Sequence, residues 1–175
     1  MSRRDPGAPL FLVGFMGSGK TAVGRALAAR RSWSFADTDA MVERALGRAV
    51  EDIFRALGEG SFRQAESEAL RSLARASRTV VATGGGLFLS VPARAFLRAH
   101  GTSVWLDVPL SIARARLGDG SGRPLWPKGD ALDGRAFFER RRACYALADF
   151  SVDASADDPA DVAEAIEERW GSLRR

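Results

Sequence analysis

Short runs of apolar residues alternate with longer amphipathic segments along most of the chain. The short runs are typical of strands buried in a parallel sheet, and the longer segments repeat apolar positions at helical spacing. The predicted strands cover residues 10–13, 33–36, 79–82, 103–107 and 150–152. The predicted helices cover residues 21–31, 40–46, 50–57, 62–77, 92–99, 110–117, 131–148 and 159–170. This repeated order of strand and helix predicts an α/β fold in which helices cover a parallel sheet.

Length and composition fit one domain, which we expect to span residues 1–175. Hydrophobic residues make up 46% of the chain and the mean hydropathy is −0.14, which suits a soluble globule with a real core. The apolar stretch around residues 10–16 is too short to cross a membrane, and residues 1–6 lack the apolar region of a signal peptide. We therefore expect a cytoplasmic protein that does not bind membranes. The single cysteine, Cys144, excludes an intramolecular disulfide and is expected to pack on a helix.

The basic residues suggest small anionic ligands rather than nucleic acid. The formal net charge is +4, and only Lys20 and Lys128 are lysines. The arginines are spread along predicted helices among acidic residues, apart from one run at residues 140–142. The sequence has neither an interleaved aromatic platform nor a recognisable nucleic-acid-binding module, so we expect no nucleic-acid partner. A basic cleft for small anions explains the composition equally well.

Residues 14–21 fit the phosphate-binding loop (P-loop) pattern of a glycine, four residues and then Gly-Lys-Ser/Thr, directly after an apolar run. The glycines allow a tight turn whose N–H groups face phosphate oxygens, and the following helix adds its positive end. We expect Lys20 to reach the β- and γ-phosphates of a nucleoside triphosphate and the Thr21 hydroxyl to ligate Mg²⁺. The nucleotide contacts predicted here are Gly17, Ser18, Gly19, Lys20, Thr21 and Ala22. A ligand-free glycine turn or a dinucleotide fingerprint fits less well, because neither needs Lys-Thr at this place.

Two carboxylates, Asp37 and Asp39, follow the second predicted strand, at the end where open α/β sheets gather their ligands. Asp37 would lie near Mg²⁺ and its waters, and Asp39 could accept a proton from an attacking hydroxyl or orient it. The alternative for either residue is that its carboxylate merely caps the following helix.

Two further segments carry candidate acceptor-site residues. Arg63 and Glu66 lie three positions apart near the start of a predicted helix; they could form an ordinary solvated ion pair, or Arg63 could point into the cleft with Glu66 steadying it. Gly84, Gly85 and Gly86 follow the third strand. Three consecutive glycines indicate that the backbone approaches a ligand closely or leaves it space.

Residues 118–129 are rich in glycine and proline and form either a plain surface loop or a closing lid. Arg123 favours the lid, because a loop that carries cations can close over phosphates.

Together these motifs resemble the shikimate kinase family from about Leu10 to Trp170. Besides the P-loop, the residues in register are Asp37-Thr38-Asp39, Gly47-Arg48, Asp52-Ile53-Phe54, Gly58-Glu59, Phe62-Arg63, Glu66, Thr83-Gly84-Gly85-Gly86, Arg123-Pro124-Leu125 and Arg141 placed four before Tyr145. The resemblance implies a nucleoside-monophosphate-kinase-like fold with a five-stranded parallel sheet and a mobile lid. It also implies an enzyme of aromatic amino-acid biosynthesis that uses Mg²⁺ and transfers the γ-phosphoryl group of ATP to the 3-hydroxyl of shikimate.

The same resemblance implies roles for individual residues. The residue at Asp39 would contact the substrate hydroxyls, and Arg63 and Arg141 would hold the carboxylate. The backbone of Gly84, Gly85 and Gly86 would lie against the substrate. Arg123 would meet the transferring phosphate, so that Lys20, Asp39 and Arg123 form the catalytic set. Arg116 and Pro159 would lie on the adenine side of ATP.

The chemistry of the acceptor agrees with these roles, since a polyhydroxylated carboxylate needs planar cationic forks and an anionic acceptor for its hydroxyls. Phe54 and Phe62 could line the apolar side of the ring or belong to the core. The sequence departs from the family at Ala49, where a helix-capping serine is frequent, and at residues 157–158, which are acidic where a basic residue near adenine is common.

Two alternatives to this function remain open. One is another small-molecule kinase of the same fold, such as a gluconate or nucleoside-monophosphate kinase; the other is a non-catalytic ATP-binding module. We expect the chain to act as a monomer on ATP and shikimate.

Overall fold

The computed structural model describes residues 5–118 and 131–173. Arg123 and most of the predicted lid, residues 118–129, lie outside the described residues. The elements in chain order are β1 (Leu10–Val13), α1 (Lys20–Arg31), β2 (Ser34–Asp37), α2 (Thr38–Leu46), α3 (Val50–Ser72), β3 (Thr79–Ala82), α4 (Val91–His100), β4 (Thr102–Asp107), α5 (Leu110–Leu117), α6 (Ala131–Tyr145), β5 (Phe150–Asp153) and α7 (Pro159–Ser172). Two short 3₁₀ turns, Leu73–Arg75 and Leu87–Leu89, follow α3 and precede α4.

The strands form one five-stranded parallel sheet in the order β2-β3-β1-β4-β5. Every residue of β1 and β3 is buried, whereas buried and exposed residues alternate along the edge strand β5. Continuous apolar runs are what parallel strands covered on both faces require, so the predicted sheet is confirmed. Each predicted strand lies within one residue of the observed one.

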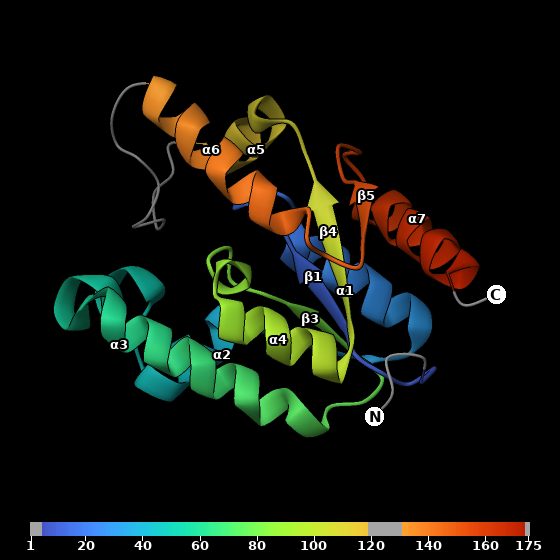
Figure 1. Cartoon of the computed structure of the whole chain (residues 1–175), viewed down its shortest axis with the longest axis horizontal. Helices are drawn as coiled ribbons and strands as arrows, with labels where there is room; N and C mark the ends of the chain where they lie inside the picture. Colours follow the sequence, from blue (N-terminus) through green and yellow to red (C-terminus); the bar gives the residue numbers. More distant parts are fainter. Residues whose placement is uncertain (1–4, 119–130, 174–175) are drawn as a thin grey trace.

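Helices cover both faces of this sheet (Figure 1). Helices α1 and α7 lie side by side on one face, and α4 lies on the other. Helices α2 and α3 pack against each other near the β2 edge. Their contact encloses a small core of its own, made by Val42, Ile53, Phe62 and Ala65. Phe54 packs on Phe62 with ring centroids 4.7 Å apart, so both rings belong to this core, as one of the two alternatives predicted.

The predicted division of residues 50–77 into two helices is confirmed, because α3 consists of two helical segments that meet in a kink at Gly58. The backbone of Gly58 is not helical (φ 79°, ψ 168°) and interrupts the helix there. A positive φ is strained for residues with a side chain, so glycine permits this break. The second segment continues from Glu59, three residues before the predicted start at residue 62, and runs to Ser72. The chain then tightens into a 3₁₀ turn, so the α-helix ends five residues before the predicted residue 77.

Helix α6 also ends earlier than predicted, at Tyr145 rather than residue 148. The N–H of Asp149 donates to the carbonyl of Ser103 (3.1 Å), and the Asp149 carboxylate accepts from the Ser103 N–H (2.8 Å). These bonds join the segment to β4 and start β5. None of the described helices is both long and apolar enough to cross a membrane.

Candidate active site

The P-loop joins the C-terminal end of β1 to α1. Gly17 has a φ of 79°, and a Cβ there would lie 2.5 Å from the carbonyl oxygen of Ala113 in α5. Glycine is therefore required both by the conformation and by the close approach of α5. Gly19 is the N-cap of α1, which begins at Lys20 as predicted to within one residue, so the helix directs its free N–H groups toward the loop.

The side chain of Lys20 folds back over the P-loop. Its Nζ donates hydrogen bonds to the carbonyl oxygens of Gly14 (2.9 Å) and Phe15 (2.7 Å), and lies 3.3 Å from Oγ of Ser18. Phosphate oxygens are charged acceptors and bind an ammonium group more strongly than neutral carbonyls do. The arrangement keeps the ammonium of Lys20 at the loop to which a triphosphate would bind.

Thr21 and Asp37 connect the P-loop helix to the end of β2. Oγ1 of Thr21 donates to Oδ2 of Asp37 at 2.8 Å, and Oδ1 of Asp37 accepts from the N–H groups of Asp39 (3.0 Å) and Ala40 (3.4 Å). Asp37 thus caps α2 with one oxygen and approaches the predicted metal ligand with the other.

Oxygen donors of this kind fit Mg²⁺, which is usually held by a hydroxyl, one or two carboxylates, waters and substrate phosphates. The described residues contain no cluster of three or more His, Cys, Asp or Glu side chains that could hold a metal ion. The oxygen donors of Thr21 and Asp37 would suit an ion that arrives with a phosphate ligand.

Asp39 and Glu66 point their carboxylates at the same spot beside Gly84. A Cβ at Gly84 would lie 2.5 Å from Oδ1 of Asp39 and 2.6 Å from Oε1 of Glu66. Glu66 is only 4% exposed, and its Oε1 is buried without a hydrogen-bond partner among the described residues. Burial raises the pKa of the Glu66 carboxyl; hydrogen bonding and the charge of Arg63 oppose that rise, and the charge of Asp39 adds to it. The missing side chain at Gly84 makes room for these two carboxylates.

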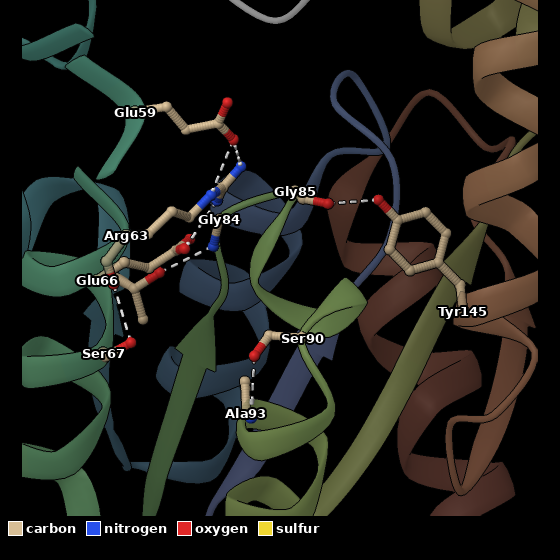
Figure 2. Close-up of polar contacts among 10 residues, drawn as sticks. Glu59, Arg63, Glu66, Ser67, Gly84, Gly85, Ser90, Ala93 and Tyr145 are labelled. Carbon is tan, nitrogen blue, oxygen red and sulfur yellow. Dashed lines mark hydrogen bonds and ion pairs between the residues drawn. The ribbon is translucent and has the colours of Figure 1, made fainter. Parts of the chain in front are cut away.

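Arg63 lies between two carboxylates of its own helix (Figure 2). Its Nη1 donates to Oε2 of Glu66 at 2.8 Å, and its Nε and Nη2 both donate to Oε1 of Glu59, at 3.2 and 3.0 Å. Burial alone would lower the pKa of Arg63, but the hydrogen bonds and charges of Glu66 and Glu59 raise it above its ordinary value. A Cβ at Gly86 would lie 2.6 Å from Nη1 and Nη2, so the glycine leaves space for the guanidinium group.

Arg141 of α6 interacts with the side chain of Tyr145, whose hydroxyl reaches the same glycine segment. It is 8% exposed, and its guanidinium group lies over the ring of Phe137, 4.0 Å from the centroid. No acidic side chain of the described residues forms an ion pair with Arg141. Burial lowers the pKa of Arg141; the neighbouring Tyr145 opposes this, while the charge of Arg63 adds to it. Tyr145, one turn further along α6, donates from its hydroxyl to the carbonyl of Gly85 at 2.5 Å (Figure 2).

On the predicted adenine side, Arg116 of α5 joins the loop that follows β5. Its Nη1 donates to the carbonyl of Ala154 (2.9 Å), and its Nη2 donates to those of Ser155 (3.2 Å) and Ala156 (2.7 Å). Helix α7 begins at Pro159 directly after this loop, with Asp158 as its N-cap. The capping role explains an acidic residue at position 158 without a nucleotide contact.

A cavity of about 750 Å³ lies between α5, α6 and β5. The charged and hydroxyl groups that line it include Asp107, Arg114, Arg135, Arg142, Ser151 and Asp153. It shares no lining residue with the P-loop or with the cluster around Gly84, but its lining includes Ser155, which belongs to the loop held by Arg116. The cavity therefore borders the predicted adenine side of the site.

Three residues to which the sequence analysis gave no role contribute to the site, although they belong to the motifs in register with the family. Oγ1 of Thr38 accepts from the N–H of Gly84 at 2.8 Å and so fixes the glycine segment against α2. Tyr145 holds Gly85, and Glu59 contacts Arg63. The spacing of four residues from Glu59 to Arg63 was a usable signal, because such pairs face each other on a helix. The contacts of Thr38 and Tyr145 join segments far apart in the chain and leave no periodic signal.

Comparison with known proteins agrees with this geometry. The family model described as shikimate kinase matches residues 16–170. The chain belongs to the shikimate kinase family. Among its relatives in this family, the shikimate kinase of Moorella thermoacetica is 44% identical over 159 residues, which cover 91% of this chain and 92% of that protein. The shikimate kinase of Microcystis aeruginosa is 42% identical over 163 residues, which cover 91% of this chain and 85% of the relative.

A solved structure of the same family superimposes closely. Shikimate kinase from Acinetobacter baumannii in complex with shikimate matches with a TM-score of 0.91 and 31% identity, covering 97% of this chain and 96% of that one. The predicted nucleoside-monophosphate-kinase-like fold and the predicted family are thereby confirmed. The roles of the single site residues remain predictions.

Proposed function

We propose that this chain transfers the γ-phosphoryl group of ATP to the 3-hydroxyl of shikimate, forming shikimate 3-phosphate and ADP. The pair Arg63 and Arg141 carries the proposal. The two arginines come from different helices: Arg63 lies against Gly86, and Arg141 is linked to Gly85 through Tyr145. Arg141 is also buried without an acidic partner among the described residues. Burying a cation without a counter-charge is costly, so this position suits a ligand that brings a negative charge.

Shikimate matches the cluster in both its acidic and its hydroxyl groups. Its carboxylate would bind the two arginines, and its hydroxyls would face Asp39 across Gly84. The similar protein from Acinetobacter baumannii was solved in complex with shikimate, which supports the same ligand here. A nucleoside monophosphate, which brings a phosphate in place of a carboxylate and ring hydroxyls, does not account as well for two arginines together with Asp39 and Glu66.

The P-loop would bind the triphosphate, with Lys20 turning from the carbonyls of Gly14 and Phe15 to the β- and γ-phosphate oxygens. Thr21 and Asp37 would hold Mg²⁺, which, when bound, neutralises charge on the phosphates. Asp39 would accept a hydrogen bond from the 3-hydroxyl and orient its oxygen for in-line attack, or take its proton. Arg123, outside the described residues, would supply a further cation. Since phosphoryl transfer needs little covalent work from the protein, positioning and charge neutralisation would account for most of the rate.

We propose that a single domain of residues 1–175 carries the whole site and acts as a monomer. Arg116 and Pro159 would bound the adenine site, and Gly84, Gly85 and Gly86 would contact shikimate through their backbone.

The test is release of ADP from Mg·ATP in the presence of shikimate, gluconate, AMP or CMP, with an acceptor-free control. Shikimate should be phosphorylated far faster than the others, with phosphate on the 3-hydroxyl by ³¹P NMR. Preference for another acceptor would leave only a P-loop kinase of this fold. ATP binding without acceptor-dependent turnover would favour the non-catalytic module.

A further inference from the structure

Glu59 occupies one edge of the Arg63 guanidinium group. Its Oε1 accepts from both Nε and Nη2, whereas Glu66 accepts from Nη1. The Nε and Nη2 edge is one of the two edges on which arginine forms a paired, fork-like contact with a carboxylate. A ligand carboxylate that approaches Arg63 on this edge therefore meets Glu59 there first.

The two carboxylates on Arg63 differ in how firmly they are held. The side chain of Glu66 is 5% exposed and that of Glu59 is 55% exposed. Glu59 lies between Gly58 and Gly60, where an added Cβ would have no neighbour within 4 Å. Its side chain can therefore rotate into open space without displacing a packed group, whereas Glu66 is enclosed beside Gly84.

The charges of the site also favour replacement of Glu59 by the substrate carboxylate over binding of the substrate carboxylate beside Glu59. Arg63 and Arg141 supply two positive charges, against the carboxylates of Asp39, Glu59 and Glu66. Glu59 affects both arginines: it hydrogen-bonds to Arg63, and its charge acts on Arg141, where it opposes the lowering of the pKa by burial. A bound carboxylate would be a fourth anion if Glu59 stayed, but leaves the charge unchanged if Glu59 moves out to solvent.

We propose that Glu59 is an internal stand-in for the substrate carboxylate, which the substrate displaces from Arg63 on binding. This inference rests on the proposed function. Glu59 would hold the guanidinium group in its binding position beside Gly86 and keep small anions off it. Only a ligand whose carboxylate lies at Arg63 while its hydroxyls reach Asp39 would replace it. Glu59 would thus lower the affinity for substrate in exchange for selectivity.

The variant that tests this is Glu59→Gln, and Glu51→Gln is its matched control. Glu51 forms an exposed pair with Arg55, also four residues apart and 3.0 Å long, on the part of α3 that precedes the kink. Glu59→Gln should lower KM for shikimate about two- to five-fold, the range expected for release of an exposed ion pair, and leave KM for ATP unchanged. Acetate, at constant ionic strength, should inhibit Glu59→Gln more strongly by a similar factor. Glu51→Gln should change neither quantity.

The same substitution in an Arg63→Ala enzyme tests whether the change in KM for shikimate acts through Arg63. In an Arg63→Ala enzyme, adding Glu59→Gln should no longer lower KM for shikimate, because the group for which the two carboxylates compete is gone. Thermal unfolding of Glu59→Gln should give a melting temperature close to that of wild type, which excludes a folding defect. Glu59→Ala should also lower KM for shikimate and increase inhibition by acetate. An unchanged or raised KM in Glu59→Gln, or an equal fall in the Arg63→Ala background, would overturn the inference. If the wild-type protein itself fails to phosphorylate shikimate, the proposed function fails instead.

Discussion

The hydroxyl of Tyr145 donates a hydrogen bond to the carbonyl oxygen of Gly85, and the two residues are 60 positions apart in the chain. Tyr145 is 2% exposed, so this bond links the interior of α6 to the glycine segment of the acceptor site. It also fixes Arg141, one turn earlier on α6, relative to that segment. The bond therefore couples the stability of the fold to the geometry of the proposed carboxylate site.

Removing this donor should affect both stability and activity. Tyr145→Phe leaves the Gly85 carbonyl without its partner, which should lower the free energy of unfolding by about 1–2 kcal/mol. KM for shikimate should rise while KM for ATP stays nearly constant. Chemical denaturation and steady-state kinetics measure the two effects, and a variant equal to wild type in both would remove Tyr145 from the account.

The same residue predicts a dependence of stability on alkaline pH. Burial raises the pKa of Tyr145 to about 12 from an ordinary value of 10.0. The folded protein then keeps a proton that the unfolded chain loses, so stability falls as the pH rises from about 10 to 12. By pH 11 the loss should be about 1.4 kcal/mol for this group. Denaturation at pH 8 and pH 11 should show this loss in wild type and a smaller one in Tyr145→Phe; equal losses would contradict the buried phenol as its source.

Lys20→Ala should lower kcat by about 10²-fold or more, because it removes a charge aimed at the transferring phosphate. The melting temperature should change little, since Lys20 contributes hydrogen bonds to the loop and no packing in the core. Arg25→Ala, an exposed change on the same helix, should keep wild-type turnover. Near-wild-type turnover of Lys20→Ala would show that the P-loop does not bind the reacting phosphate.

Asp39→Asn distinguishes a base from an orienting group. If Asp39 takes the proton of the 3-hydroxyl, kcat should fall by about 10²-fold or more. If it only orients the hydroxyl, the loss should be smaller and divided between kcat and KM. An unchanged kcat/KM for shikimate would exclude Asp39 from the acceptor site.

Gly84→Ala should be destabilising and nearly inactive. The new Cβ would lie 2.5 Å from Oδ1 of Asp39 and 2.6 Å from Oε1 of Glu66, so these carboxylates must move. Overpacking of this kind costs about 1–3 kcal/mol. Gly60→Ala is the control, because an added Cβ at this helical position would meet no atom within 4 Å. This variant should be neutral or slightly stabilising, since alanine favours a helix more than glycine does. Full activity of Gly84→Ala would contradict the close packing of the two carboxylates.

Much of the fold follows from local sequence signals. The buried strands β1 and β3 are continuous apolar runs, and such runs fit only strands or helices that are covered on both sides. The P-loop follows from spacing alone, because few other structures place glycines and Lys-Thr after a strand. The break of α3 at Gly58 follows from the sequence, since a glycine pair with a glutamate between them usually interrupts a helix, whereas the start of the second segment directly after it, at Glu59, did not.

The candidate site was predictable in its residue types but not in its contacts. Arg140, Arg141 and Arg142 are adjacent in sequence, and only Arg141 is buried, because it shares a helix face with Phe138 and Tyr145. The family resemblance indicated this arginine; the run of three by itself did not. The pairing of Arg63 with Glu66 was open between a solvated pair and a site contact, and the fold buries Glu66 and brings Gly86 against the guanidinium group of Arg63.

The most direct test of the central claim measures KM for shikimate and for ATP in Arg141→Ala. Loss of a charge-assisted contact of about 1.5–3 kcal/mol should raise KM for shikimate by about 10- to 150-fold and change KM for ATP much less. Arg141→Lys should recover only part of the loss, because an ammonium group cannot form the two-point fork. Arg142→Ala, which removes a surface pair with Asp107 and a contact with the ring of Trp105, should leave KM for shikimate nearly unchanged. An Arg141→Ala effect confined to ATP, or equal effects of the two alanine variants, would contradict the proposed carboxylate site.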